Sequence, residues 1–537
     1  MAKQIGKQVV SSSPAQTIAA RSQSSPQLDG MWRKLGRQAY QTLKGQFVLL
    51  AAGCMLVALI LSLLIAQQFR RANDDLNTIV SGSIPSVNAA QAIAQYIGDI
   101  DAKSADYLAT ASLKETGPCS VVGTGNTTID GGTLTVHDCD AKDINAELIL
   151  MNQQIYLAAH NVTYSGEQTA IERIIAGAEE YSSNVAIMQH EFSLAKSMTD
   201  PQDEHLVRAY AAYQAAGDVL HSRIQRVPQH NANGTYALDE SSLPNCRIGS
   251  RSLSPNEWVF AGIETNVDCL NAINKQHLDD AYSNVSGSLT GDVVLAILLC
   301  LAFCALLAFT TWRMARITHR IINMGLSLAL VIGIVFSLTV VSNFLNFAGR
   351  HGAYGQIVQD DYDSIYYAAQ LNRYATNANA DESRWLVALT FHDQAGVARW
   401  QADWQTSTQQ VQTLIDRAQA NRTWPEEDQP LQDMHNWWAK YYGIDGSIRS
   451  TAQVTDGIAS STHLLQAEKL STGDSNTAFG NFTTAVDHLR QANDGHYSAT
   501  LQATQITLNV YSLFSLVLFI SLGILAVWGV MYRLKDF

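Results

Sequence analysis

Charged residues and prolines are scarce in this sequence. Only 15% of its 537 residues are Asp, Glu, Lys or Arg, whereas 47% are hydrophobic, and it contains only 10 prolines. A chain this apolar is not disordered, because disordered segments combine low hydrophobicity with high charge. So few prolines exclude a proline-rich linker array and favour long helices, since proline breaks a helix interior.

Motifs for catalysis and for metal or cofactor binding are missing as well. The sequence has no glycine-rich phosphate loop, no Cys-x-x-Cys pair, no histidines at metal-binding spacing and no nucleophile elbow. The run from His137 to Asp140 contains metal-ligand types, but its cysteine suits a disulfide and its aspartates suit a helix cap. We therefore expect a protein that is not an enzyme and that holds no metal and no cofactor.

The apolar residues gather in four long stretches. A helix needs about 20 apolar residues to cross a bilayer, and the uncharged apolar runs within 46–66, 292–312, 322–346 and 509–532 are long enough. The first run exceeds the apolar core of a secretory signal, so we interpret it as an uncleaved anchor. Four transmembrane helices would then separate a leader (1–45), two large segments (67–291 and 347–508), a short loop (313–321) and a tail (533–537).

Basic residues orient these predicted spans, because Lys and Arg accumulate in cytoplasmic loops. The leader and the short loop supply the residues that we assign to topology or to the membrane surface: Arg33, Lys34, Arg37, Lys44, Arg313, Arg316 and Arg320. The basic leader would either bind anionic lipid or serve only to set the topology. We expect a multi-pass plasma-membrane protein with both termini in the cytoplasm and both large segments outside, and no nucleic-acid partner.

Four cysteines lie in the first large segment, outside the predicted spans. Their proximity in sequence favours two disulfides, Cys119–Cys139 and Cys246–Cys269, as expected in an oxidising compartment. Four free thiols are the alternative.

Helical periodicity runs through both large segments. Apolar residues recur every three or four positions, which predicts antiparallel helical bundles whose first and last helices continue into the spans. Pro85 should kink the first helix. Polar, glycine-rich insertions interrupt the first bundle at 114–140 and 229–255, and the former reads as a small β-hairpin stapled by a disulfide. The fold class is therefore all-α, with two tandem span–bundle–span units. The runs 102–108 and 380–386 share a small residue, an aromatic residue and a leucine in the same order, which supports a duplication.

The candidate ligand-binding residues lie around these two runs. In the second bundle they are Asp381, Glu382 and Arg384, where the guanidinium would bind a carboxylate while Trp385 or Trp438 stacks nearby. Asp101, Lys103 and Asp106 hold the corresponding place in the first bundle. A solvated helix face with a weak ion pair is the alternative for Asp381 and Arg384. Trp437 adjoins Trp438, so both cannot face one core, and Trp437 is a candidate partner contact.

Two sets of residues resemble known families. The run Ser83–Val87 with Ile93, Ile97, Asp101 and Tyr107-Leu108 resembles the first helix of the four-helix-bundle sensor domain of methyl-accepting chemotaxis receptors and sensor kinases. The runs Asn377–Leu386 and Thr472–Phe479 resemble segments of actinobacterial-type four-span membrane proteins. Those proteins pair with a solute-binding lipoprotein and a cytosolic Ser/Thr kinase in amino-acid sensing.

These resemblances imply a sensor that signals through helix shifts to a separate cytoplasmic protein, such as a kinase, because the inner loop has no room for a relay coiled coil. Outside, the partner would be a small amino or organic acid, or a solute-binding protein, and the chain could form a homodimer. The alternative function is a structural scaffold that organises envelope proteins without changing state.

Overall fold

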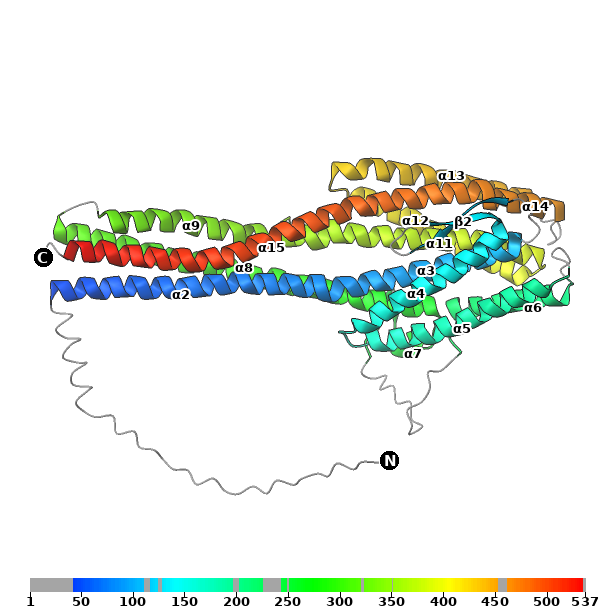
Figure 1. The fold of residues 1–537 in the computed structure, drawn as a ribbon, viewed down its shortest axis with the longest axis horizontal. Helices are drawn as coiled ribbons and strands as arrows, with labels where there is room; N and C mark the ends of the chain where they lie inside the picture. The colour runs from blue at the N-terminus through cyan, green and yellow to red at the C-terminus, as the bar shows by residue number, and fades with distance from the viewer. Residues whose placement is uncertain are drawn as a thin grey trace, which may run out of the picture. The chain divides into compact units, whose positions relative to one another are not determined.

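The computed structural model describes residues 42–110, 116–123, 128–196, 202–225, 243–248, 251–319, 323–349, 351–452 and 461–534. In these residues the chain is almost entirely α-helical, with two small two-stranded sheets. It divides into two compact units (Figure 1). We call Leu64–Leu298 with Leu338–Ser515 the bundle unit, and the remaining residues the span unit.

Four helices are long and apolar enough to cross a membrane, which confirms the four predicted spans. They are α2 (Leu43–Thr78), α8 (Ile263–Thr318), α9 (Met324–Ala348) and α15 (Asn476–Leu534). Inside the span unit, Gly325 and Gly529 let α9 and α15 approach closely, since a Cβ on Gly325 would lie 2.7 Å from the Cα of Gly529. Small residues at a helix crossing are typical of packing between membrane helices.

The basic residues assigned to topology are only partly described. Lys44 is exposed in the first turn of α2. Arg313 donates to Gln46 over 3.2 Å, and the Arg316 guanidinium lies 5.5 Å from the centre of the Trp312 ring. Arg33, Lys34, Arg37 and Arg320 lie outside the described residues.

Among the described residues, the first half of the bundle unit contains the end of α2, the start of α8 and, between them, α3 (Ile84–Ala109), α4 (Val136–His160), α5 (Glu167–Leu194) and α6 (Glu204–His221). Their apolar faces share one core with the start of α8. The predicted hairpin is present as β1 (Thr116–Val122) paired antiparallel with β2 (Thr128–Thr135). A second short hairpin, β3 (Cys246–Ile248) with β4 (Arg251–Leu253), precedes the one-turn helix α7 (Pro255–Trp258).

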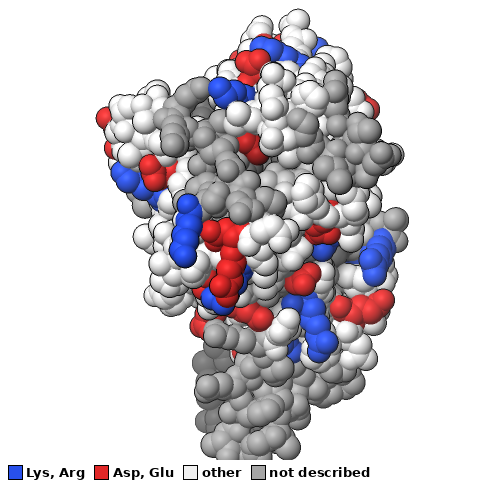
Figure 2. Space-filling view, turned by 90° about the vertical axis from the view of Figure 1, so that its right-hand side faces the viewer, with Lys and Arg blue, Asp and Glu red and all other residues white. Residues whose placement is uncertain are grey.

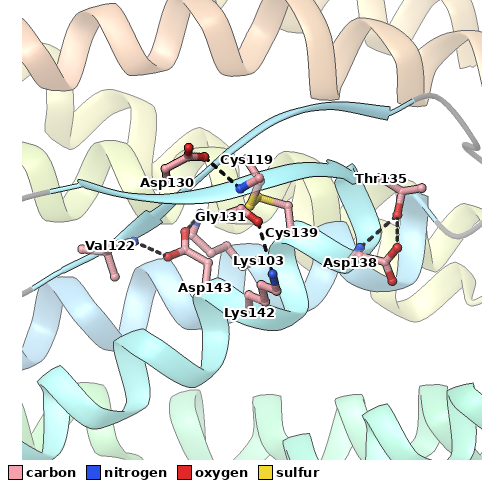
Figure 3. The surroundings of a disulfide bond; sticks show 11 residues. Lys103, Cys119, Val122, Asp130, Gly131, Thr135, Asp138, Cys139, Lys142 and Asp143 are labelled. Atoms are coloured by element: carbon pink, nitrogen blue, oxygen red, sulfur yellow. Dashed lines mark hydrogen bonds and ion pairs between the residues drawn. A yellow bond between two sulfur atoms is a disulfide. The ribbon is translucent and has the colours of Figure 1, made fainter.

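Both predicted disulfides, Cys119–Cys139 and Cys246–Cys269, are present. The insertion predicted at 114–140 ends earlier than expected, because the Thr135 hydroxyl accepts from the Asp138 backbone N–H and starts α4 at Val136. Cys139 therefore lies in the first turn of α4, and its disulfide ties the hairpin to that helix (Figure 3).

The second half consists of α10 (Ala353–Gly355), the π-helix η4 (Gln356–Tyr362), α11 (Asp363–Thr390), α12 (Gln394–Ala420), the 3-10 turn η5 (Pro425–Glu427), α13 (Asp428–Ala452), α14 (Ser461–Leu470), the π-helix η6 (Ser471–Ser475) and α15. η6 joins α14 to α15 without a break, so one helical stretch runs from Ser461 to Leu534. A third π-helix, η1 (Ile79–Ser83), lies just before Pro85. There the Ile84 N–H reaches the carbonyl of Ile79, so the helix absorbs the missing proline donor by widening its turn.

The first helices of the two halves, α3 and α11, pack against each other (Figure 1). The Gln91 amide donates to the Tyr366 carbonyl over 3.3 Å, and the Tyr362 hydroxyl donates to Asn88 over 3.1 Å. Gly98 makes this approach possible, since a Cβ there would lie 3.2 Å from the Thr376 side chain. The two halves therefore pair within one chain.

A matching turn in each half supports the duplication independently. In the first half, the Asn161 amide donates to Ser86 over 2.8 Å, and the Glu167 carboxylate accepts from the backbone N–H groups of residues 163 and 164. In the second half, Asn421 donates to Ser364 over 2.9 Å, and Glu427 accepts from residues 423 and 424.

The aromatic residue of each turn stacks on a histidine. The Tyr164 ring lies 3.9 Å from that of His277 on α8, and the Trp424 ring lies 4.1 Å from that of His496 on α15. The turns match Ser86 with Ser364 and Asn161 with Asn421, and the ring pairs match His277 with His496. The two halves therefore align α3 with α11, α4 with α12, and α8 with α15.

Candidate functional site

Arg384 on α11 is the centre of a buried cluster of charges. Its side chain is 2% exposed. One guanidinium nitrogen, Nη1, donates to Asp381 on the same helix over 2.5 Å, and the other, Nη2, pairs with Asp101 on α3. The alternative of a solvated helix face is therefore wrong for Asp381 and Arg384. The pair Asp101–Arg384 instead joins the two halves of the bundle unit.

Polar groups from neighbouring helices complete the surroundings of this cluster. The Tyr181 hydroxyl donates to Asp101 over 3.2 Å, and the Ser407 hydroxyl donates to Asp381 over 3.3 Å. Burial raises the pKa of the Asp381 carboxyl well above its usual range. The two carboxyl groups thus flank one guanidinium, and their remaining oxygens receive hydroxyl donors, as buried polar groups require.

The aromatic partner of Arg384 is Trp400 on α12, whose ring centre lies 4.7 Å from the guanidinium carbon. The stacking expected from Trp385 or Trp438 is wrong. Trp385 instead lies under Arg449, at 4.7 Å, and Trp438 is 4% exposed in the core between Tyr441 and Phe482. Trp385 therefore packs on Arg449 and Trp438 on Tyr441 and Phe482, so both rings belong to the packing of the second half.

His221 and Glu264 form a second ion pair beside the cluster. The His221 Nδ1 lies 2.9 Å from a Glu264 carboxylate oxygen, and its Nε2 lies 4.0 Å from Asp101. Burial disfavours the charged form of each group, but the mutual attraction outweighs it. The pair raises the pKa of His221 and lowers the pKa of Glu264 to about 2. Asn377 also donates to Glu264, over 3.2 Å.

A cavity of about 360 Å³ opens next to these groups. Its charged lining comes from α6, α8, α11 and α12: His221, Glu264, Asp381, Arg384, Arg399 and Asp403. Arg399 and Asp403 are 39% and 50% exposed and lie 3.7 Å apart, so they form the solvent-facing part of the lining. The cavity is at the lower end of the size range of small-molecule sites, and it offers groups of both charge signs.

Lys103 and Asp106 do not join the Arg384 cluster. Lys103 pairs with Asp143 on α4 over 2.7 Å, close to the Cys119–Cys139 disulfide (Figure 3). Although burial opposes its charge, the acids around Lys103 raise its pKa, and burial raises the pKa of neighbouring Asp99 to about 6. Asp106 accepts from Ser383 over 2.5 Å, which adds another polar contact between α3 and α11.

Glu382 faces away from Arg384, toward η6. Its carboxyl is fully buried and accepts hydrogen bonds from Ser471 over 2.7 Å and from Ser475 over 3.0 Å. Burial raises the pKa of Glu382 to about 8. Glu382 is therefore a structural neighbour of the cluster and not part of its lining.

The partner-contact candidate Trp437 is partly buried, and the Lys440 ammonium lies 4.7 Å from its ring centre.

On the face shown in Figure 2, acidic and basic side chains lie next to one another and do not form separate patches. Electrostatics on this face therefore favours no partner of one charge sign.

The sequence analysis missed His221, Glu264, Trp400 and Arg399. His221 ends α6 and Glu264 begins α8, and the chain between them includes a long polar insertion. No spacing rule links two residues across such an insertion.

No family model, curated protein or solved structure matches this chain. The structure by itself defines the class: a helical membrane protein with four candidate spans, two disulfides and a paired helical-bundle unit.

Proposed function

We propose that this chain is a plasma-membrane sensor. Its bundle unit would face outward, bind a small solute in the cavity beside Arg384 and signal through the spans to a separate cytoplasmic protein. The observation that carries the proposal is the presence of arginines and carboxylates together in the lining of this one small cavity. A free amino acid carries both a carboxylate and an ammonium group, so both of its charges find partners there.

A route from the cavity to the membrane supports the sensor. Glu264 lines the cavity from the first turn of α8, a helix of 56 residues that includes the second candidate span. A solute that displaces Glu264 acts on a helix that is continuous with a span. Shifts of about 1–2 Å along or about such a helix are sufficient for signalling at subunit and partner interfaces.

The second candidate function is a structural scaffold. It is favoured by the saturation of Arg384, whose guanidinium already pairs with Asp101 and Asp381. A cation with two buried carboxylate partners holds α3 and α11 together and does not need a solute. A solute-binding protein that docks on the bundle unit would act from outside on this same contact between α3 and α11.

Thermal unfolding of the full-length protein in detergent, with and without single amino acids and organic acids, distinguishes these functions. A solute at 100 times its Kd stabilises the folded chain by about 2.7 kcal/mol, so a sensor should show a saturable rise in melting temperature. Arg399→Ala is expected to increase at least tenfold the solute concentration that is needed for the same rise in melting temperature. It strands no buried carboxylate, because Arg399 and its partners Asp218 and Asp403 are 39–60% exposed.

Arg422→Ala is the matched control, because Arg422 is 53% exposed, pairs with Asp428 and lies outside the cavity. It should leave the response unchanged. Absence of a rise with every amino acid and organic acid would rule out direct solute sensing and favour the scaffold or a docked binding protein. An equal response in wild type and Arg399→Ala would place the solute elsewhere.

A further inference from the structure

The outward face of α4 carries a groove of apolar side chains. Ile149 and Tyr156 are each 61% exposed and Leu157 is 54% exposed. Together with Asn152 and Gln153 they line a shallow groove of about 600 Å³. We call these five residues the α4 stripe. Single exposed apolar residues are ordinary, but three neighbours on one helix face indicate a contact surface.

The second half of the chain supplies an internal comparison for this stripe. The matching turns align α4 with α12, and buried positions confirm the register: Ile144, Met151 and Ile155 correspond to Trp404, Val411 and Ile415. At the positions equivalent to the exposed apolar residues of the stripe, α12 has Gln409, Asp416 and Arg417, all exposed.

The same helix position in the same arrangement therefore tolerates polar and charged side chains. Folding of the bundle does not require apolar residues there, because burial is absent at both sets of positions. What distinguishes α4 from α12 is that its exposed face carries large apolar side chains, which a covering surface would remove from water.

The exposed positions of α4 from Asn145 to Ala159 are also free of charged side chains, in a chain with a formal net charge of −13. They are Asn145, Ile149, Asn152, Gln153, Tyr156, Leu157 and Ala159. When a surface meets a second copy of itself, every charge near the symmetry axis meets a like charge. An uncharged stripe avoids that repulsion, whereas a charged partner would be expected to leave opposite charges on it.

The size of the stripe fits the centre of a dimer interface. At these exposures its three apolar side chains present roughly 350 Å², taking about 200 Å² for a fully exposed large side chain. A specific interface buries about 800 Å² per partner, with an apolar core and a polar rim. The carboxamides of Asn152 and Gln153 supply hydrogen-bonding groups for such a rim.

We propose that the α4 stripe is a homodimer interface, in which α4 packs against α4 of a second copy around a two-fold axis. This interface is separate from the α3–α11 pairing, which is complete within one chain. It does not depend on whether the cavity beside Arg384 binds a solute.

The first test is the mass of the full-length protein in detergent micelles and in lipid nanodiscs, measured at micromolar concentration. The triple variant Ile149→Gln, Tyr156→Asp, Leu157→Arg places the residues of α12 on α4. We expect a dimer for wild type, and for the variant a single-chain mass with an unchanged melting temperature. The triple variant Gln409→Ala, Asp416→Ala, Arg417→Ala on α12 is the matched control and should remain dimeric.

Cysteine cross-linking tests the geometry without relying on that variant. Residues at a two-fold axis contact their own equivalents whichever way the helices run. Gln153→Cys, at the centre of the stripe, should therefore form an intermolecular disulfide under mild oxidation, whereas Thr413→Cys at the equivalent position of α12 should not. A wild-type protein of single-chain mass with no Gln153→Cys cross-link would overturn the proposal and leave the stripe to a different protein. A dimer that persists in the α4 triple variant would overturn it as well.

Discussion

Glu382 should make the folded chain less stable as the pH rises from about 5 to about 8. Its carboxyl is fully buried on α11 and has Ser471 and Ser475 of η6 as hydrogen-bond partners. Burial first, and then the charge of Asp445, raise the pKa of Glu382 from 4.5 to about 8. In this window the folded chain keeps a proton that the unfolded chain has released. The stabilisation is therefore complete below pH about 4.5 and is lost as the pH rises through about 8.

The size of this effect follows from the width of the window. One pKa unit corresponds to about 1.4 kcal/mol, so stability should fall by about 1.4 kcal/mol per pH unit and by roughly 5 kcal/mol over the whole window. Glu382→Gln removes the titration but keeps the shape and a hydrogen-bonding oxygen. Its stability relative to wild type should rise with the same slope.

The assay is thermal unfolding of full-length wild type and Glu382→Gln in detergent at pH 5, 6, 7 and 8, with hydrogen exchange across η6 as the local readout. Glu426→Gln is the matched control, because the Glu426 side chain is 63% exposed and its removal should not change the slope. Parallel pH profiles for wild type and Glu382→Gln would show that Glu382 does not retain its proton, and the reasoning from burial would then be refuted.

Two further changes test the joint between the halves and the second disulfide. Arg384→Ala should destabilise the folded chain by about 3–5 kcal/mol, because Asp101 and Asp381 stay buried without their cation. Adding Asp101→Asn should restore part of that loss in the same unfolding assay, and a cost of Arg384→Ala below about 1 kcal/mol would mean that the cluster is hydrated. Replacing Cys246 and Cys269 by serine opens a bridge between residues 23 positions apart and should cost about 3 kcal/mol. Unfolding that is unchanged by this double replacement would contradict a formed bridge.

Local patterns in the sequence were sufficient for most of the architecture. Long uncharged runs predicted the spans, a helical period predicted the bundles, and proximity predicted both disulfides, since each of these properties depends on residues close together in the chain. Boundaries were less accurate. The insertion predicted to end at residue 140 ends at Thr135, because the Thr135 hydroxyl accepts from the Asp138 backbone N–H and starts α4 at Val136.

The candidate site was predicted only in part. Arg384 and Asp381 stood out by their spacing, and Asp101 by its place in the corresponding helix of the first half. Their meeting in one cluster, the replacement of Trp385 and Trp438 by Trp400, and the separation of Lys103 to its own site with Asp143 depend on how α3, α4, α11 and α12 pack. The repeat of 102–108 in 380–386 showed that α3 and α11 correspond to each other, but it did not show that they are in contact.

The amino-acid sequence by itself determined the spans, the helices, the disulfides and the duplication, because hydrophobic length, periodicity and cysteine spacing are properties of neighbouring residues. Only the tertiary structure decided which buried charges share a cation, that His221 meets Glu264, and that the α4 stripe stays uncovered while α12 is polar at the same positions. Those outcomes depend on contacts between residues far apart in the chain, so the sequence around one residue does not indicate its partner. Burial then strengthens the electrostatic interaction between the two.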